Sequence, residues 1–178
     1  MLTIDRILCP VDLSDESKRA FDYALALGRR FEAEVRVVHV VDMGAWIGLP
    51  VEGIAELADS ARVSLREQLD WWVARHLKGG AEVRSDLREG PVVHGIVAAA
   101  AEMRADIAMY SGRYREAEAI YRSLVNGSGT TNQYVRLALL KGRMGSPGEA
   151  AALLEAAEKR YHAGNPAMRA WLKLQRGL

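Results

Sequence analysis

The stretch ADIAMYSGRYREAEAIYRSL, residues 105–124, fits two incompatible folds. Its first half is a short apolar run that ends near a glycine, as a buried strand does ahead of a phosphate-binding loop. Its second half is typical of a helical hairpin of the kind that recurs about every 34 residues. Because the chain before residue 105 alternates strands with helices, we predict a strand over 106–110, with a continuous helix over 94–110 as the alternative.

Length and composition place the chain among ordinary globular proteins. It has 178 residues, of which 49% are hydrophobic and 26% charged, which suits one large domain or a small domain with an appendage. A net charge of +1 gives no ground for expecting a nucleic-acid partner. Cys9 is the only cysteine, so no internal disulfide can form. No segment approaches the roughly 18 apolar residues of a membrane span, and we expect a cytoplasmic protein.

The N-terminal segment carries the signature of a strand followed by a helix. Residues 6–11, RILCPV, form a short apolar run that suits a strand buried on both faces. Ser14, followed by two carboxylates, marks the start of a helix. The residues expected on the buried face of this helix are Ala20, Tyr23, Ala24, Leu27 and Phe31.

Further alternation follows up to residue 104. The predicted elements are a valine-rich strand over 34–42, an amphipathic helix over 52–77 that ends at Gly79-Gly80, a strand over 81–90 and an alanine-rich helix over 92–104. Strands that alternate with helices imply right-handed crossovers and a parallel sheet. The predicted class is therefore α/β.

Three motifs in order carry a resemblance to a known family. They are ILCPVDLS at 7–14, VRVVHVVD at 35–42 and REGPVVHGIVAAAAEMRADI at 88–107. Over about residues 3–107 the chain resembles the universal stress protein family. The resemblance implies an open parallel sheet of the nucleotide-binding α-hydrolase-like kind, here with three or four strands. It also implies a non-catalytic stress-response or signalling role, and many family members bind ATP at the carboxyl ends of the strands.

The resemblance implies the adenosine-binding residues. Pro10, Val11 and Asp12 would line the adenosine, with Asp12 accepting a hydrogen bond from a ribose hydroxyl. Val40 would meet the adenine edge through its backbone. From the residues alone, Pro10 can equally end a strand, Val40 can lie in the core, and Asp12 can lead into a helix.

The phosphate half of the family's site is reduced. The family loop has the pattern Gly-x-x-Gly, nine residues, Gly-Ser/Thr, and here only Gly112 represents it, since Arg122 follows after nine residues. No second valine-rich strand follows residue 112. ATP is therefore expected as a weak ligand, with Gly112 as the one loop contact. Walker-type, zinc-ligand and Ser/His/Asp patterns are absent, so we expect neither an enzyme nor a metal site.

The C-terminal segment contains an internal repeat. Sequence around Gly112 superimposes on sequence around Gly145 with an offset of 145 − 112 = 33 residues. This resembles the tetratricopeptide repeat (TPR), with Ala105/Ala138 and Ala117/Ala150 as the small contact positions. The predicted helices span 113–125, 131–144, 147–162 and 166–176. We therefore divide the chain into an α/β domain at 1–112 and an all-α TPR-like tail at 113–178.

Several functions stay open for this fusion. The helices can bind a protein or peptide partner while the α/β half is scaffold, or they can only cover a sheet edge left bare by missing strands. The family habit of pairing through a fifth strand adds a homodimer as another partner. Because both families match the sequence at 105–112, a third interpretation is a recombined or engineered chain without an evolved function.

Overall fold

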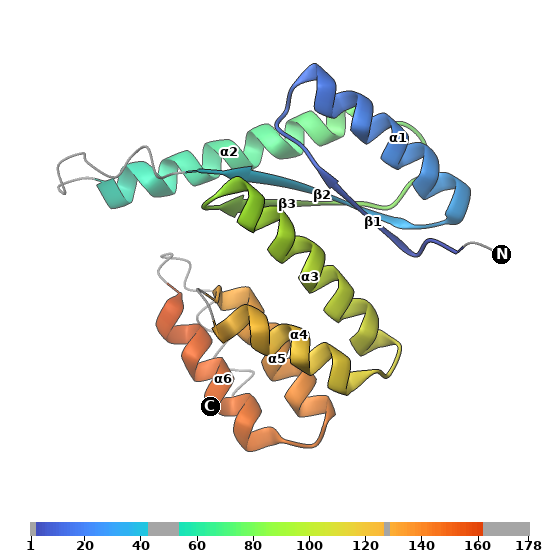
Figure 1. The fold of residues 1–178 in the computed structure, drawn as a ribbon. Helices are drawn as coiled ribbons and strands as arrows, with labels where there is room; N and C mark the ends of the chain where they lie inside the picture. The colour runs from blue at the N-terminus through green and yellow to red at the C-terminus, as the bar shows by residue number, and fades with distance from the viewer. Residues whose placement is uncertain (1–2, 43–53, 127–128, 162–178) are drawn as a thin grey trace. The chain divides into compact units, whose positions relative to one another are not determined.

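A computed structural model of the chain describes residues 3–42, 54–126 and 129–161, with side chains in the second helix described from Ser60 onward. The chain divides into two compact units, Met1–Ala99 and Ala100–Leu178 (Figure 1). Unit 1 holds the strands, and the described elements of unit 2 are all helices, joined by short turns. The predicted helix over 166–176 lies outside the described residues.

Unit 1 is built on a parallel sheet. Its strands are β1 (Arg6–Pro10), β2 (Glu34–Val41) and β3 (Val83–Glu89), in the order β1-β2-β3. In the register Cys9 lies beside Val37, and Val37 lies beside Ser85. The predicted open α/β sheet is confirmed, with three strands in the described part of the chain.

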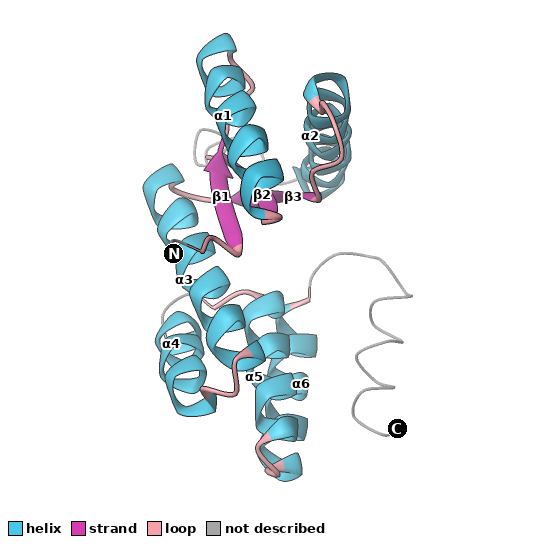
Figure 2. Cartoon of the chain, turned by 90° about the vertical axis from the view of Figure 1, so that its right-hand side faces the viewer, coloured by secondary structure: helices cyan, strands magenta, loops and turns pink. Residues whose placement is uncertain are grey.

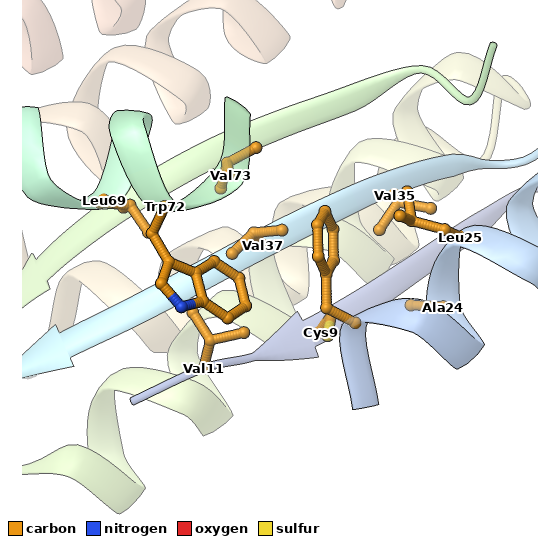
Figure 3. Packing of buried hydrophobic residues seen from close by; sticks show 10 residues of the cluster. Cys9, Val11, Ala24, Leu25, Val35, Val37, Leu69, Trp72 and Val73 are labelled. Carbon is orange, nitrogen blue, oxygen red and sulfur yellow. The ribbon is translucent and has the colours of Figure 1, made fainter. Parts of the chain in front are cut away.

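Helices α1 (Asp15–Phe31) and α2 (Ile54–His76) cover one face of the sheet (Figure 2). The indole of Trp72 in α2 lies 5.4 Å, between ring centroids, from Phe21 in α1. Figure 3 shows the same indole reaching from α2 toward Val11. The buried core on this face consists of Cys9, Val11, Phe21, Ala24, Leu25, Val35, Val37, Leu69, Trp72 and Val73.

The buried face of α1 differs from the predicted one. Its buried residues are Phe21, Ala24, Leu25 and Gly28, whereas Tyr23 is 75% and Leu27 is 43% exposed. The cause is the close approach of the helix to β2 at Gly28. A Cβ on that residue would lie 2.7 Å from Cγ2 of Val35, so the side that lacks a side chain turns toward the strand.

Helix α3 (Val92–Tyr110) begins on the opposite face of the sheet. There Val38, Val40 and Ala99 form a small buried cluster, with Leu8 and Ile96 packed against it. Gly95 allows this contact, because a Cβ there would lie 2.7 Å from Cγ1 of Val40. Both faces of β2 are therefore covered within unit 1, as a buried parallel strand requires.

The predicted strand over 106–110 is wrong, because α3 continues through it to Tyr110. The buried side chains Glu102, Ala105, Asp106 and Met109 recur at spacings of three and four, which is helical periodicity. Alanine and methionine also favour a helix. The helix predicted over 92–104 is therefore longer than expected and ends at Tyr110.

Unit 2 continues with α4 (Tyr114–Asn126), α5 (Thr131–Arg143) and α6 (Pro147–Arg160), which confirms the three predicted helices within a few residues. The turns after α3 and α5 match at the 33-residue offset found in the sequence. In the first turn Arg113 N donates to Ala108 O at 2.8 Å, and in the second Ser146 N donates to Lys141 O at 2.9 Å. Gly112 and Gly145 have positive φ values of 74° and 77°. The two turns therefore share one backbone design.

Candidate functional site

Asp12 follows the carboxyl end of β1 and organises the turn into α1. Its Oδ1 accepts a hydrogen bond from the amide of Ser14 at 3.0 Å, and a second from the hydroxyl of Ser14. The hydroxyl of Ser14 in turn accepts from the amide of Ser17 at 3.2 Å, which caps α1. The two bonds from Ser14 lower the pKa of Asp12 to about 2. Asp12 is therefore an exposed, ionised carboxylate at the edge of the sheet.

His39 ties the end of β1 to β2. Its Nδ1 lies 2.8 Å from the carbonyl oxygen of Val11, and the amide of Val11 donates to Val38 O at 2.9 Å. Because a carbonyl oxygen can only accept, Nδ1 carries the proton in this contact. The strand end beside Asp12 is thus held by a side chain as well as by the ladder.

Val40 has its side chain in the core. It is 8% exposed and packs against Gly95 and Ala99. Its side chain is therefore committed to packing, and any ligand contact at this position falls to the backbone, as the family resemblance implies.

The carboxyl end of β3 leads directly into α3. Gly90 has a φ of 115°, and its amide donates to Val41 O at 2.9 Å. Val92 and Val93, which follow Pro91 at the start of α3, are 47% and 76% exposed. They are not among the site residues expected from the sequence, although the sequence shows an apolar pair after a Gly-Pro turn. The three strand ends share one edge, because carboxyl ends of parallel strands point the same way.

Gly112 belongs to unit 2, and Pro10, Val11, Asp12 and Val40 belong to unit 1. Its amide donates to Met109 O at 3.2 Å, and its positive φ closes the last turn of α3. The structure therefore places the four residues expected to line an adenosine in unit 1, and gives Gly112 a local role as a helix cap.

Cys9 lies in the buried core of unit 1. Burial raises the pKa of the Cys9 thiol to about 11, so at neutral pH the side chain is a protonated, buried thiol rather than a nucleophile.

In the described ranges no cluster of His, Cys, Asp and Glu has the arrangement of a metal site. No helix in the described part of the chain combines the length and apolar character needed to cross a membrane.

The fold is that of an α/β protein with an open parallel sheet, in which the three strands end at one edge. The chain belongs to the universal stress protein family, whose sequence model matches residues 3–121. It is 29% identical over 110 residues to "Universal stress protein MJ0531" of Methanocaldococcus jannaschii. The matched part covers 57% of this chain and 61% of that relative. The chain thus spans about three-fifths of that relative's length. "Universal stress protein UspA from Lactobacillus plantarum" aligns with a TM-score of 0.37 and 18% identity, over 65% of this chain and 74% of that one.

Proposed function

We propose that this chain is a non-catalytic stress-response module that binds adenine nucleosides weakly at the carboxyl edge of its sheet. Membership of the universal stress protein family supports the stress-response role. The observation that carries the ligand proposal is Asp12, an exposed carboxylate held at the end of β1 by Ser14.

The proposed site holds the nucleoside through one charged side chain and through backbone groups. The carboxylate of Asp12 accepts hydrogen bonds from the ribose hydroxyls, beside Pro10 and Val11, and the backbone of Val40 meets the adenine edge. Gly112 caps α3 in unit 2, and the proposal assigns it no contact with the ligand. Because its amide already donates to Met109 O, the proposal expects phosphates to add little to the affinity for ATP.

The test is a pair of conservative substitutions, Asp12→Asn and Asp15→Asn. Both positions are exposed carboxylates near the start of α1, so the pair matches in charge and location. Asn at 12 keeps an oxygen for the bonds from Ser14 and loses only the charge. Adenosine titration followed by thermal unfolding reports binding, because a ligand of the folded state stabilises it by RT ln(1 + [L]/Kd). We expect Asp12→Asn to weaken binding about tenfold and Asp15→Asn to leave it unchanged.

Two results would count against this function. Equal adenosine binding by the two variants would remove Asp12 from the site. No stabilisation of the unchanged chain at millimolar adenosine or ATP would remove the nucleoside proposal as a whole, while leaving the family assignment in place.

A second function is favoured by the helical hairpins: unit 2 acts as a TPR-like adaptor for a protein partner. Support comes from the matched turns at Gly112 and Gly145 and from the buried small residues Ala105 and Ala138 at equivalent positions. Leu139 on α5 is 44% exposed, which leaves an apolar contact point on the same unit.

This adaptor function is tested by pull-down with the full chain and two charge insertions. Leu139→Glu alters unit 2, and Val63→Glu alters α2 of unit 1, where Val63 is 59% exposed. A partner that the unchanged chain recovers should be lost with Leu139→Glu and retained with Val63→Glu. The reverse pattern would assign partner binding to the α/β unit instead.

A further inference from the structure

The turn from α3 to α4 forms one wall of an open groove with a volume of about 780 Å³, and the end of α5 forms the other. Three arginines line it, Arg113, Arg115 and Arg143, and all three are exposed. Two half-buried apolar side chains, Tyr114 and Met144, line it as well. The groove therefore combines cationic groups with an apolar surface.

The charges along this groove do not cancel. Glu116 is the one carboxylate residue among those lining it in the described chain, so its lining carries three positive charges against one negative, a net +2. Arg113 contacts Glu116 at 2.9 Å, and Arg104 contacts it at 3.6 Å. The guanidinium of Arg143 lies 5.4 Å from the ring centroid of Tyr110, a contact that orients the cation without neutralising it.

Cations farther along the same helices are neutralised. The ammonium of Lys141 lies 2.6 Å from Glu118 and 3.1 Å from Glu149. The guanidinium of Arg122 contacts the same two carboxylates, at 2.8 Å and 3.1 Å. The excess positive charge is therefore confined to the groove and does not extend along α4.

This confinement decides between ligand classes. A nucleic acid is bound by an extended cationic track that follows its phosphates, and here the charge is local and the whole chain carries only +1. A short acidic peptide needs a few cations and an apolar contact for one side chain. Arg115, Arg143, Tyr114 and Met144 supply that combination.

We propose that this groove binds an acidic segment of a partner protein. Its carboxylates pair with Arg115 and Arg143, and an apolar side chain of the segment packs on Tyr114 and Met144. The proposal rests on the adaptor function of unit 2 and names the chemistry of the partner and the residues that meet it.

The experiment measures fluorescence anisotropy of a labelled glutamate-rich peptide that contains a central leucine, with the full chain as receptor. The test variant is Arg115→Gln/Arg143→Gln, and the single variant Arg115→Gln accompanies it because Arg143 also contacts Tyr110. The matched control is Arg19→Gln/Arg30→Gln, which removes the same charge from exposed positions on α1. The competitors are the unlabelled glutamate peptide, a peptide with glutamine in place of glutamate, inorganic phosphate and a short single-stranded RNA. Circular dichroism confirms that each variant is folded.

We expect the affinity for the peptide to fall as the salt concentration rises. The affinity should be about tenfold lower in the double variant, about threefold lower in the single variant and unchanged in the control. Equal binding by the double variant and the control would overturn the proposal, as would no binding to the unchanged chain. Displacement by RNA or phosphate but not by unlabelled glutamate peptide would also overturn it. The Leu139→Glu pull-down tests the adaptor function separately, so failure of the groove and failure of the adaptor are distinguishable.

Discussion

The phenol of Tyr121 in α4 donates a hydrogen bond to the carboxylate of Asp106 in α3, and both side chains are buried. The other oxygen of Asp106 accepts from the guanidinium of Arg136 in α5. One carboxylate therefore joins three helices of unit 2. Burial and the Asp106 charge together raise the pKa of Tyr121, so the phenol stays protonated and remains a donor across the physiological range.

This network gives a graded stability prediction. Tyr121→Phe removes one hydrogen bond and should lower the free energy of unfolding by about 1 kcal/mol. Asp106→Ala should cost about 3 kcal/mol or more, because it leaves the charge of Arg136 without its carboxylate partner. Urea unfolding measures both. Tyr23→Phe, at a position 75% exposed, is the control and should change nothing. Equal stability of Tyr121→Phe and Tyr23→Phe would show that the network does not stabilise unit 2.

Cys9 predicts a pH dependence whose sign follows from burial. Its pKa is about 11 in the folded chain and about 8.5 in an unfolded one. The protonated thiol therefore favours the folded state, and its contribution is fully present below about pH 8.5 and is lost as pH rises through 11.

Alkylation measures this directly, since Cys9 is the only cysteine. At pH 8, iodoacetamide should react about a hundredfold more slowly with the folded chain than with the chain in urea. Similar rates in the two conditions would mean that the first strand is not buried between its helices.

The close approach of α3 to β2 predicts opposite effects for two glycine substitutions. Gly95→Ala places a Cβ 2.7 Å from Cγ1 of Val40, and we expect a loss of about 1–3 kcal/mol. Gly142→Ala, in α5, meets nothing within 4 Å and should gain about 0.5–1 kcal/mol from reduced backbone freedom. Thermal unfolding of the two variants gives the comparison. A stabilising Gly95→Ala would contradict the packing of Gly95 on Val40.

The sheet could be predicted from the sequence because its signal is local. Valine-rich runs such as 34–42 lie between segments with helical periodicity, and such runs predict strands that are buried on both faces. The side chains of β2 are buried in this way. The placement of Asp12 after β1 followed from the same pattern and from Ser14 as a helix cap. The buried face of α1 could not be predicted in the same way. It depends on Gly28, whose missing side chain matters only once Val35 lies against it.

The secondary structure of residues 106–110 could not be predicted from the local sequence. A short apolar run reads equally as a buried strand or as a buried helical turn. Asp106 decides for the helix, because its partners Tyr121 and Arg136 come from two later helices. These partners lie 15 and 30 residues away in the sequence, so the contacts can be recognised only in the folded structure. The groove at Arg115 and Arg143 was missed for the same reason, since it brings together residues from two separate helices.

The central claim is that the chain keeps the adenosine side of a universal stress protein site, while Gly112, the one glycine of the phosphate loop, caps α3 instead. Isothermal titration of the unchanged chain with adenosine, AMP and ATP in the same buffer tests it most directly. The account predicts measurable binding of all three, with dissociation constants within about threefold of each other, a spread of less than 1 kcal/mol. ATP binding tenfold or more tighter than adenosine would show that the phosphates are held and would contradict the account, as would the absence of binding by all three.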